Sequence, residues 1–250
     1  VNPVLLLTVG ERDLSKSGWV AFFDNPPLRP HETYVAELGE RYLKTSVTLE
    51  GARTTITLAD ITAGNFRGDL RVTVYRNSPL LHLESVVTTY QDARAIIYDA
   101  GLAGPVPAWA AVAWNDAQGK FQRTELSTLG PDTPAAPVAG AGRTIVAENP
   151  GGSLAVFPAP HRFFYPLDEA YNLKFVWHGR NFRDLAPGFG IGIRQSASGD
   201  RRYVPWFNAP PGTQQHLGVF YHLSRGKAEQ ALESVARYTR RDRFKRLPGH

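Results

Sequence analysis

The sequence contains no cysteine, and it also contains no methionine. Without thiol groups the chain forms no disulfide, performs no thiol chemistry and builds no zinc site of the cysteine type. Methionine is missing even from the first position, which is Val1. Removal of a signal peptide would explain this start, and so would a trimmed N-terminus. The first explanation predicts a secreted or periplasmic protein.

Long hydrophobic runs and strong catalytic motifs are missing too. No apolar run approaches the ~20 residues that cross a bilayer, so we expect no membrane span. There is no nucleophile elbow, no P-loop and no HExxH motif, and we expect no cofactor and no metal site. The glycines of GFGIG, residues 188–192, lie in strand-like sequence without a following helix, so they do not form a phosphate loop.

The chain carries a mild positive charge, with a formal net charge of +5 and a sequence pI near 9.5. This charge could attract a phosphate, an acidic glycan or an acidic protein surface. It lacks the repeated basic and aromatic pattern of a nucleic-acid platform, so we do not expect nucleic acid as a partner. The basic residues are most crowded near the end of the chain, at Arg237, Arg240, Arg241, Arg243, Lys245 and Arg246.

Alternation of apolar and polar residues dominates the first half of the sequence. Two β-branched runs flank Glu50-Gly51 and predict a hairpin over residues 40–61. A second hairpin is predicted over residues 68–90, with its turn at Asn77-Ser78-Pro79. The alternation has a period of two, which indicates strands with one face turned inward and the other outward.

The periodicity changes to that of a helix only near the end of the chain. Ala228, Leu232, Val235 and Tyr238 follow one another at spacings of four, three and three. This spacing places them on one stripe of an amphipathic helix, predicted over residues 226–241. Ser224 precedes the helix and could cap its first turn.

These patterns together predict an all-β protein: a large antiparallel β-sandwich, supersandwich-like, with one C-terminal amphipathic helix. We expect a single domain over residues 1–250 and a tail or linker over 242–250. The stretch 129–144 is rich in Gly, Pro and Ala. It is either a surface loop or a seam between subdomains.

Aromatic and polar residues gather in three segments of the second half, around residues 161, 178 and 207. Sugars stack their apolar faces on aromatic rings, and their hydroxyl groups need fixed donors and acceptors. The competing interpretation is that most of these rings belong to the core, because the aromatic content of 11% is only modestly high. The predicted carbohydrate-binding residues are His161, Arg162, Trp177, His178, Arg180, Trp206 and Asn208.

Strand spacing predicts two further pairs of side chains that contain histidine. His82 and Glu84 are two residues apart and share a face, either as an acid–base pair or as a solvated pair. His216 and His222 are six residues apart and also share a face. On a strand this spacing spans about 20 Å, so the two histidines cannot bind one metal ion.

Several stretches resemble a group of uncharacterised bacterial proteins. They include GDLRVTVYRNSPLLHLESVVTT (68–89), PWFNAPPGTQQHLGVFYHLS (205–224) and RYTRRDRFKRLPGH (237–250). In that group a β-sandwich region is followed by a metal-dependent hydrolase domain of the polymerase-and-histidinol-phosphatase (PHP) type. The resemblance implies that residues 242–250 form the junction, with the metal ligands beyond His250. Residues 70–87 also resemble, more weakly, the galactose-mutarotase-like supersandwich.

Three functional hypotheses follow. The first is a non-catalytic carbohydrate-binding module, accessory to a larger secreted hydrolase. The second is an extracellular structural subunit that self-associates through edge strands, with VLLLTV (4–9) as an unpaired strand. The third is a sugar-active enzyme of mutarotase-like fold, an epimerase or hydrolase. Its candidate acid and base are His161 or His178 with Glu84, Asp99 or Asp168.

Overall fold

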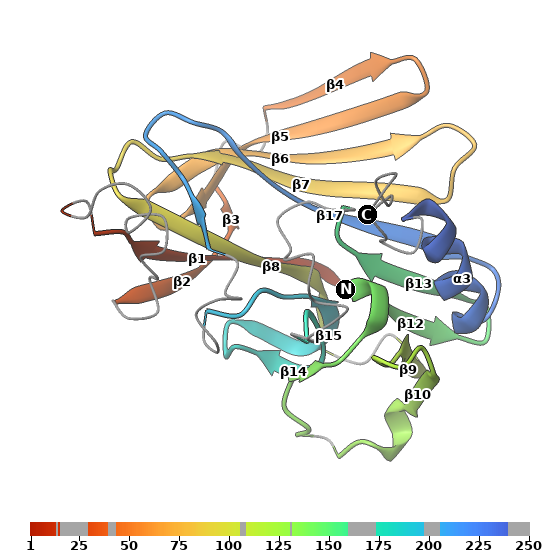
Figure 1. Cartoon of the computed structure of the whole chain (residues 1–250). Helices are drawn as coiled ribbons and strands as arrows, with labels where there is room; N and C mark the ends of the chain where they lie inside the picture. Colours follow the sequence, from red (N-terminus) through yellow and green to blue (C-terminus); the bar gives the residue numbers. More distant parts are fainter. Residues whose placement is uncertain are drawn as a thin grey trace, which may run out of the picture.

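The computed structural model describes residues 1–13, 15, 30–39, 44–105, 109–130, 132–159, 174–197 and 206–239. Within these residues the chain forms two antiparallel β-sheets and one α-helix (Figure 1). The predicted all-β sandwich with a C-terminal helix is therefore confirmed. The same part of the chain has no helix that is long and apolar enough to cross a membrane. The predicted PHP junction, residues 242–250, lies outside the described residues.

The first sheet, sheet A, is built around β8 (Arg94–Gly104) and β1 (Asn2–Glu11). Because β1 pairs with β8 on one side and β2 on the other, the prediction of an unpaired strand at residues 4–9 is wrong. The short β16 pairs with the beginning of β8, next to β15 on the same edge. Sheet A runs in the order β11 (Ala136–Val138), β14 (Val176–Phe182), β15 (Ala186–Ile193), β8 (Arg94–Gly104), β1 (Asn2–Glu11) and β2 (His31–Val35), with β16 at Phe207–Asn208.

The second sheet, sheet B, contains both predicted hairpins, which are confirmed. They are β4 (Thr45–Glu50) with β5 (Arg53–Ala63), and β6 (Phe66–Tyr75) with β7 (Leu80–Thr88). The strand after the second hairpin in the sheet is β17, which comes from the far end of the sequence. Sheet B runs in the order β10 (Phe121–Glu125), β9 (Ala111–Asn115), β12 (Ile145–Asn149), β13 (Gly152–Phe157), β17 (Gln215–Ser224), β7 (Leu80–Thr88), β6 (Phe66–Tyr75), β5 (Arg53–Ala63) and β3 (Glu37–Leu38), with β4 (Thr45–Glu50) also on β5.

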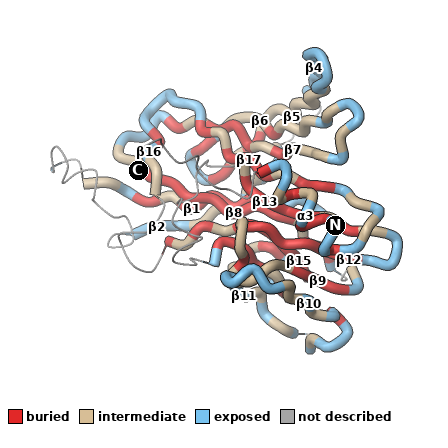
Figure 2. The backbone as a smooth tube through the Cα atoms, turned by 45° about the vertical axis from the view of Figure 1, so that its right-hand side comes forward, coloured by how far each residue is buried: buried red, intermediate tan, exposed pale blue. Residues whose placement is uncertain are grey.

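The core lies between the two sheets. Alternate residues of β8, such as Ile96, Tyr98 and Ala100, are buried there against residues of sheet B. Figure 2 shows the central strands of both sheets as buried and β4, at the outer end of sheet B, as exposed. The stretch 129–144, a loop or seam in the prediction, contains β11, which pairs with β14 and so belongs to sheet A.

Helix α3 (Ala228–Tyr238) covers the outer face of sheet B next to β13, β12 and β9 (Figure 1). Ala228, Ala231, Leu232 and Val235 form its buried stripe. The predicted helix extended to residue 241, but residues after 239 lie outside the described part.

The N-terminus of α3 is capped from a distant strand, and the prediction that Ser224 caps it is wrong. Glu148 on β12 accepts a hydrogen bond from Ala228 N at 2.5 Å. The same carboxylate binds the guanidinium of Arg123, with Nη2 at 2.9 Å. Ser224 instead accepts a hydrogen bond from Gly226 N in the preceding turn. A negative charge at a helix N-terminus is stabilising, so Glu148 fixes the helix to the sheet.

Substitution of Glu148 by Gln should destabilise the protein in a pH-dependent way. Burial alone would raise the pKa of Glu148, but the hydrogen bonds from Ala228 and Arg123 and the charge of Arg123 hold it below 4.5. A depressed pKa stabilises the folded state above the unfolded-state pKa, and this contribution is lost as the pH falls through the folded-state pKa. At pH 7 we expect the free energy of unfolding of E148Q, measured by urea denaturation, to be lower than that of wild type by about 1–3 kcal/mol.

The difference in free energy of unfolding between wild type and E148Q should become smaller as the pH falls below 4.5, the ordinary pKa of a glutamate side chain. Glu233→Gln, at an exposed position of the same helix, is the matched control and should change little. A pH-independent difference for E148Q would show that the charge of Glu148 has no part in its effect.

Candidate ligand-binding site

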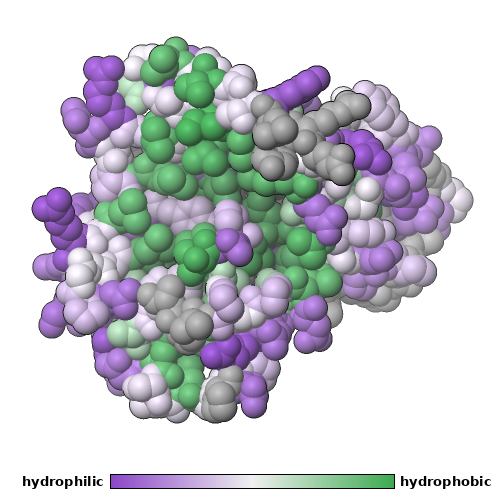
Figure 3. Space-filling view, turned by 180° about the vertical axis from the view of Figure 1, so that it is seen from behind, coloured by the Kyte–Doolittle hydropathy of each residue, from purple (hydrophilic) through white to green (hydrophobic). Residues whose placement is uncertain are grey.

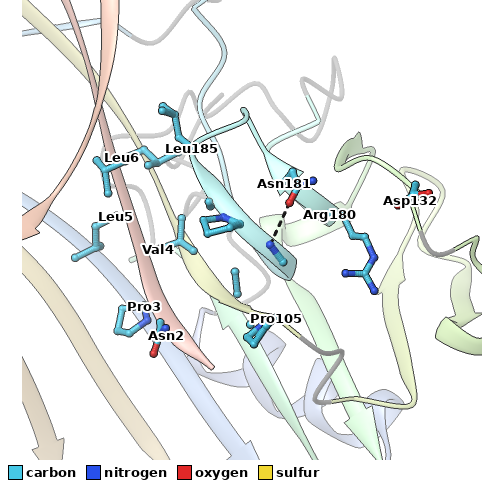
Figure 4. A pocket seen from close by; sticks show the side chains of 16 residues that line it. Asn2, Pro3, Val4, Leu5, Leu6, Pro105, Asp132, Arg180, Asn181 and Leu185 are labelled. Atoms are coloured by element: carbon cyan, nitrogen blue, oxygen red, sulfur yellow. Dashed lines mark hydrogen bonds between the residues drawn. The ribbon is translucent and has the colours of Figure 1, made fainter.

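A groove of about 480 Å³ opens on the outer face of sheet A (Figure 4). Val4 and Leu6 of β1 line one side, and Leu185 and Ala186 of the β14–β15 hairpin continue the apolar surface. Cavities of about 300–1,000 Å³ with a mainly apolar lining are typical of small-molecule sites. Figure 3 shows that hydrophobic residues also gather broadly on the face turned away from the viewer in Figure 1, with hydrophilic residues around them.

Polar side chains lie at the other side of this groove, where Figure 4 shows Arg180, Asn181 and Asp132. The side-chain Oδ1 of Asn181 accepts a hydrogen bond from Gly188 N at 3.1 Å, which leaves its NH₂ group for a ligand. Among the described residues, none forms a hydrogen bond or ion pair with the guanidinium of Arg180. The lining of the groove therefore combines apolar residues with one cationic and one amide residue.

Local backbone geometry holds these two donors in place. Arg180 N donates to Thr133 O at 3.0 Å, and Ala135 N donates to Arg180 O at 2.7 Å, so both backbone groups of Arg180 are fixed. A β-bulge follows between Arg180 and Phe182, and Asn181 adopts a φ of 52°. Asn tolerates this left-handed conformation better than most residues. Bulges of this kind often re-aim a side chain next to a functional site.

An ion pair between the buried Asp99 and the partly exposed Arg183 anchors the hairpin that carries these residues. Arg183 Nε donates to Asp99 Oδ2 at 2.5 Å, and Arg183 Nη2 donates to Gln195 O at 2.8 Å. The other carboxylate oxygen of Asp99 accepts Gln195 N at 2.9 Å. Burial raises the pKa of Asp99, whereas the charge and hydrogen bonds of Arg183 oppose that shift. Because both oxygens are engaged and the residue is 1% exposed, Asp99 is not an accessible acid or base.

Trp177 was predicted to be a stacking platform, and this prediction is wrong. Its side chain is fully buried on the outer side of sheet A. The ring stacks on Phe182 with centroids 4.0 Å apart, and Nε1 donates to Ile193 O at 3.2 Å. The ring also lies close over Gly190 and Gly192, where a Cβ atom would meet it at 2.7 and 2.6 Å. Trp177 is a packing residue beneath the hairpin.

The other predicted residues that the structure describes do not come together in one place. His178 faces the interior between the sheets, 5.4 Å from the ring of Trp114, and burial lowers its pKa. Of the predicted residues that the structure describes, only Arg180 lines the groove. His161 and Arg162 lie outside the described residues, as does Asp168.

Trp206 and Asn208 lie at the opposite end of β8, beside its first residues. Arg12 donates to both of them: Nε to Asn208 Oδ1 at 3.0 Å, and Nη2 to Trp206 O at 3.4 Å. The Trp206 ring meets the ring of His31 edge-on, with centroids 5.9 Å apart. These contacts form a polar cluster of their own, separate from the groove.

A carboxylate–histidine pair that sequence analysis missed lies on the outer face of sheet B. Glu84 Oε2 is 3.2 Å from His216 Nδ1 across the pairing of β7 with β17. Glu84 and His82 do share a face as expected, and the His82 ring stacks on Phe220 at 4.3 Å between centroids. The predicted combination of Glu84 with His178 is wrong, because His178 points between the sheets. In the part of the chain that is described, no group of three or more His, Cys, Asp and Glu residues could hold a metal ion.

Replacement of Trp177 by Ala should affect stability much more than ligand affinity. Loss of a fully buried Trp costs about 3–5 kcal/mol in the free energy of unfolding. Urea denaturation measures this loss, and Trp206→Ala, at a half-buried indole, is the matched control with a smaller expected loss. A W177A variant of wild-type stability would contradict the buried position.

Comparison with protein-family models and with curated proteins gives no match. Solved structures with partial likeness include the family GH36 α-galactosidase from Geobacillus stearothermophilus (12% identity, TM-score 0.41, 79% of this chain and 28% of that chain). They also include an α-mannosidase from Enterococcus faecalis (11% identity, TM-score 0.44, 97% of this chain and 28% of that chain). A putative aldose 1-epimerase from Klebsiella pneumoniae is similar over 84% of this chain and 56% of that chain, with 15% identity and a TM-score of 0.33. Because this chain spans 28% of the length of the first two enzymes, the activity of a whole enzyme does not follow for it.

Proposed function

We propose that this chain is a non-catalytic carbohydrate-binding module and that the groove on sheet A holds the sugar. The observation that carries the proposal is that Arg180 and Asn181 line the same groove as the apolar residues Val4 and Leu6. A sugar ring has apolar C–H faces and a rim of hydroxyl groups, so it needs an apolar surface and fixed polar groups together. Here aliphatic side chains take the place of the aromatic wall that sequence analysis expected.

The preferred ligand in this proposal is an acidic sugar. The guanidinium of Arg180 is a planar donor that matches the geometry of a carboxylate and binds it with two parallel hydrogen bonds. Asp132 lines the same groove and can accept hydrogen bonds from sugar hydroxyl groups. The net charge of +5 favours the approach of an anionic glycan.

The wider setting belongs to the same proposal. We propose that the module is secreted or periplasmic and serves a larger hydrolase, in line with the sequence resemblance at residues 68–89 and 205–224. In that setting a weak sugar-binding groove raises the local concentration of substrate near a separate catalytic domain.

Arg180→Ala should weaken the binding of an acidic sugar. Titration calorimetry of the 250-residue chain with glucuronate, galacturonate and their oligomers, next to neutral glucose and galactose, measures the dissociation constants. Loss of a charge-assisted hydrogen bond of about 1.5–3 kcal/mol corresponds to a roughly tenfold to hundredfold weaker affinity. The neutral sugars should lose less, because they do not engage the charge.

Arg67→Ala, which removes an exposed arginine on β6 of sheet B, is the matched control and should leave the affinity unchanged. Absence of binding to every sugar at millimolar concentration would refute the proposal. Equal effects of R180A and R67A would show that net charge, and not the groove, attracts the ligand.

A second candidate function, a sugar-active enzyme, is favoured by the Glu84–His216 pair. A carboxylate 3.2 Å from an imidazole can act as a base while the imidazole positions or shares the proton. The stacked rings of His82 and Phe220 lie beside it and offer a surface for a sugar ring. The side chain of Glu84 is 12% exposed and that of His216 is 31% exposed, so a substrate must come to an open sheet face.

Glu84→Gln tests this second function. If the pair is catalytic, interconversion of hexose anomers, followed by NMR exchange, should fall about 10²- to 10⁴-fold in the variant. Glu32→Gln on β2 is the control, and R180A should keep the wild-type rate. A wild-type rate equal to that of buffer would exclude the activity and leave the binding proposal untouched.

A further inference from the structure

The hairpin β4–β5 and the adjoining part of β6 form a wing with an uncovered apolar face. Val47 of β4 is opposite Ile56 of β5, and Leu49 lies one row further out. Val47 is 60% exposed and Leu49 is 76% exposed, whereas the same face is buried further along the sheet at Leu83. Figure 1 shows β4 at the outer end of sheet B, away from sheet A. The face of sheet B that is buried in the core at Leu83 is therefore exposed to solvent at β4.

Strand β4 also lacks the features that protect other outer strands from pairing. β11 contains Pro137, and β10 carries Arg123, which is tied to Glu125 and Glu148. β4 reads TSVTLE, with no proline and with Glu50 as its only charged residue, at its last position. All six residues are exposed, and among the described strands only β5 pairs with it. A regular edge without charge or proline is a ready template for another strand.

Residues 44–50, which are Lys44 and strand β4, are complementary to themselves in one antiparallel register. When two copies pair with Val47 opposite Val47 of the partner subunit, Lys44 lies opposite Glu50 of the partner subunit, at both ends of the ladder. Directly opposed residues in an antiparallel pair point to the same face. This register therefore also joins the apolar faces of the two wings, because Thr45 meets Leu49 of the partner subunit.

We propose that β4 pairs antiparallel with β4 of a second copy of this chain, centred on Val47, and joins two B sheets across a two-fold axis. The occupant is a second copy because both the charges and the apolar face match under the same register. A register shifted by one residue would place the apolar face of one wing beside the polar face of the other. A register shifted by two would take Lys44 away from Glu50.

Val47→Lys tests the pairing, because the axis places the two new lysines opposite each other. Sedimentation velocity of the 250-residue chain over a wide concentration range should show a monomer–dimer equilibrium for wild type. Like charges directly opposed across two strands are destabilising, so V47K should raise the dimer dissociation constant about tenfold or more. Leu223→Lys, at a leucine of 55% exposure on β17, is the matched control and should leave the dimer unchanged.

A charge exchange tests the register itself. Lys44→Glu and Glu50→Lys should each weaken the dimer by about fivefold or more, because each creates two like-charge pairs. The double variant K44E/E50K should restore the wild-type constant, which a general change in charge or solubility would not do. Circular dichroism and urea unfolding of each variant separate loss of pairing from loss of fold.

Three results would overturn the proposal: a wild-type monomer at every concentration, a dimer that V47K does not weaken, or single charge variants without rescue in the double variant. Species larger than a dimer that persist in V47K would place the contact on another surface. None of these measurements uses a sugar, so the outcome is independent of the proposed carbohydrate binding.

Discussion

Two buried tyrosine hydroxyl groups hold the sheets of the sandwich together. The hydroxyl of Tyr98 in sheet A donates to Gly218 O in sheet B at 2.6 Å, and that of Tyr221 in sheet B donates to Gly101 O in sheet A at 3.0 Å. Burial raises the pKa of Tyr221, so its hydroxyl remains a donor at any physiological pH. These reciprocal bonds fix the distance and the relative position of β8 and β17, on which the outer faces depend.

The alternation of β8 connects this cross-link to the groove. Tyr98 points inward to sheet B, so its neighbour Asp99 must point outward. There it binds Arg183 and the backbone of Gln195, and this largely buried ion pair anchors the β14–β15 hairpin that supplies Arg180, Leu185 and Ala186 to the groove. Removing one partner of such a pair leaves a buried charge uncompensated, which costs about 3–5 kcal/mol. The site geometry thus rests on the same strand that fixes the sandwich.

Sequence analysis succeeded where the signal is local. The period of two around Glu50-Gly51 and Asn77-Ser78 predicted the hairpins, and the spacing of Ala228, Leu232 and Val235 predicted the helix. It failed where pairing joins distant segments. The groove, the Glu84–His216 pair and the Glu148 cap each require contacts that no local pattern contains. Trp177 was wrongly predicted to be exposed. The alternation along a strand shows which residues share a face of the sheet, but it does not show whether other residues cover that face.

Self-pairing at β4 would leave the grooves of both subunits open, because the groove lies over β1, β8 and β15 of the other sheet. A dimer of this kind is bivalent toward a polymeric ligand. When two weak sites bind repeated sugars on one chain, the second binding event is intramolecular, and avidity can exceed the single-site affinity by about 10²–10⁴. A single groove with only two fixed donors would bind weakly by itself, so self-pairing through an exposed edge strand would give the proposed module a physical route to tight binding of a glycan.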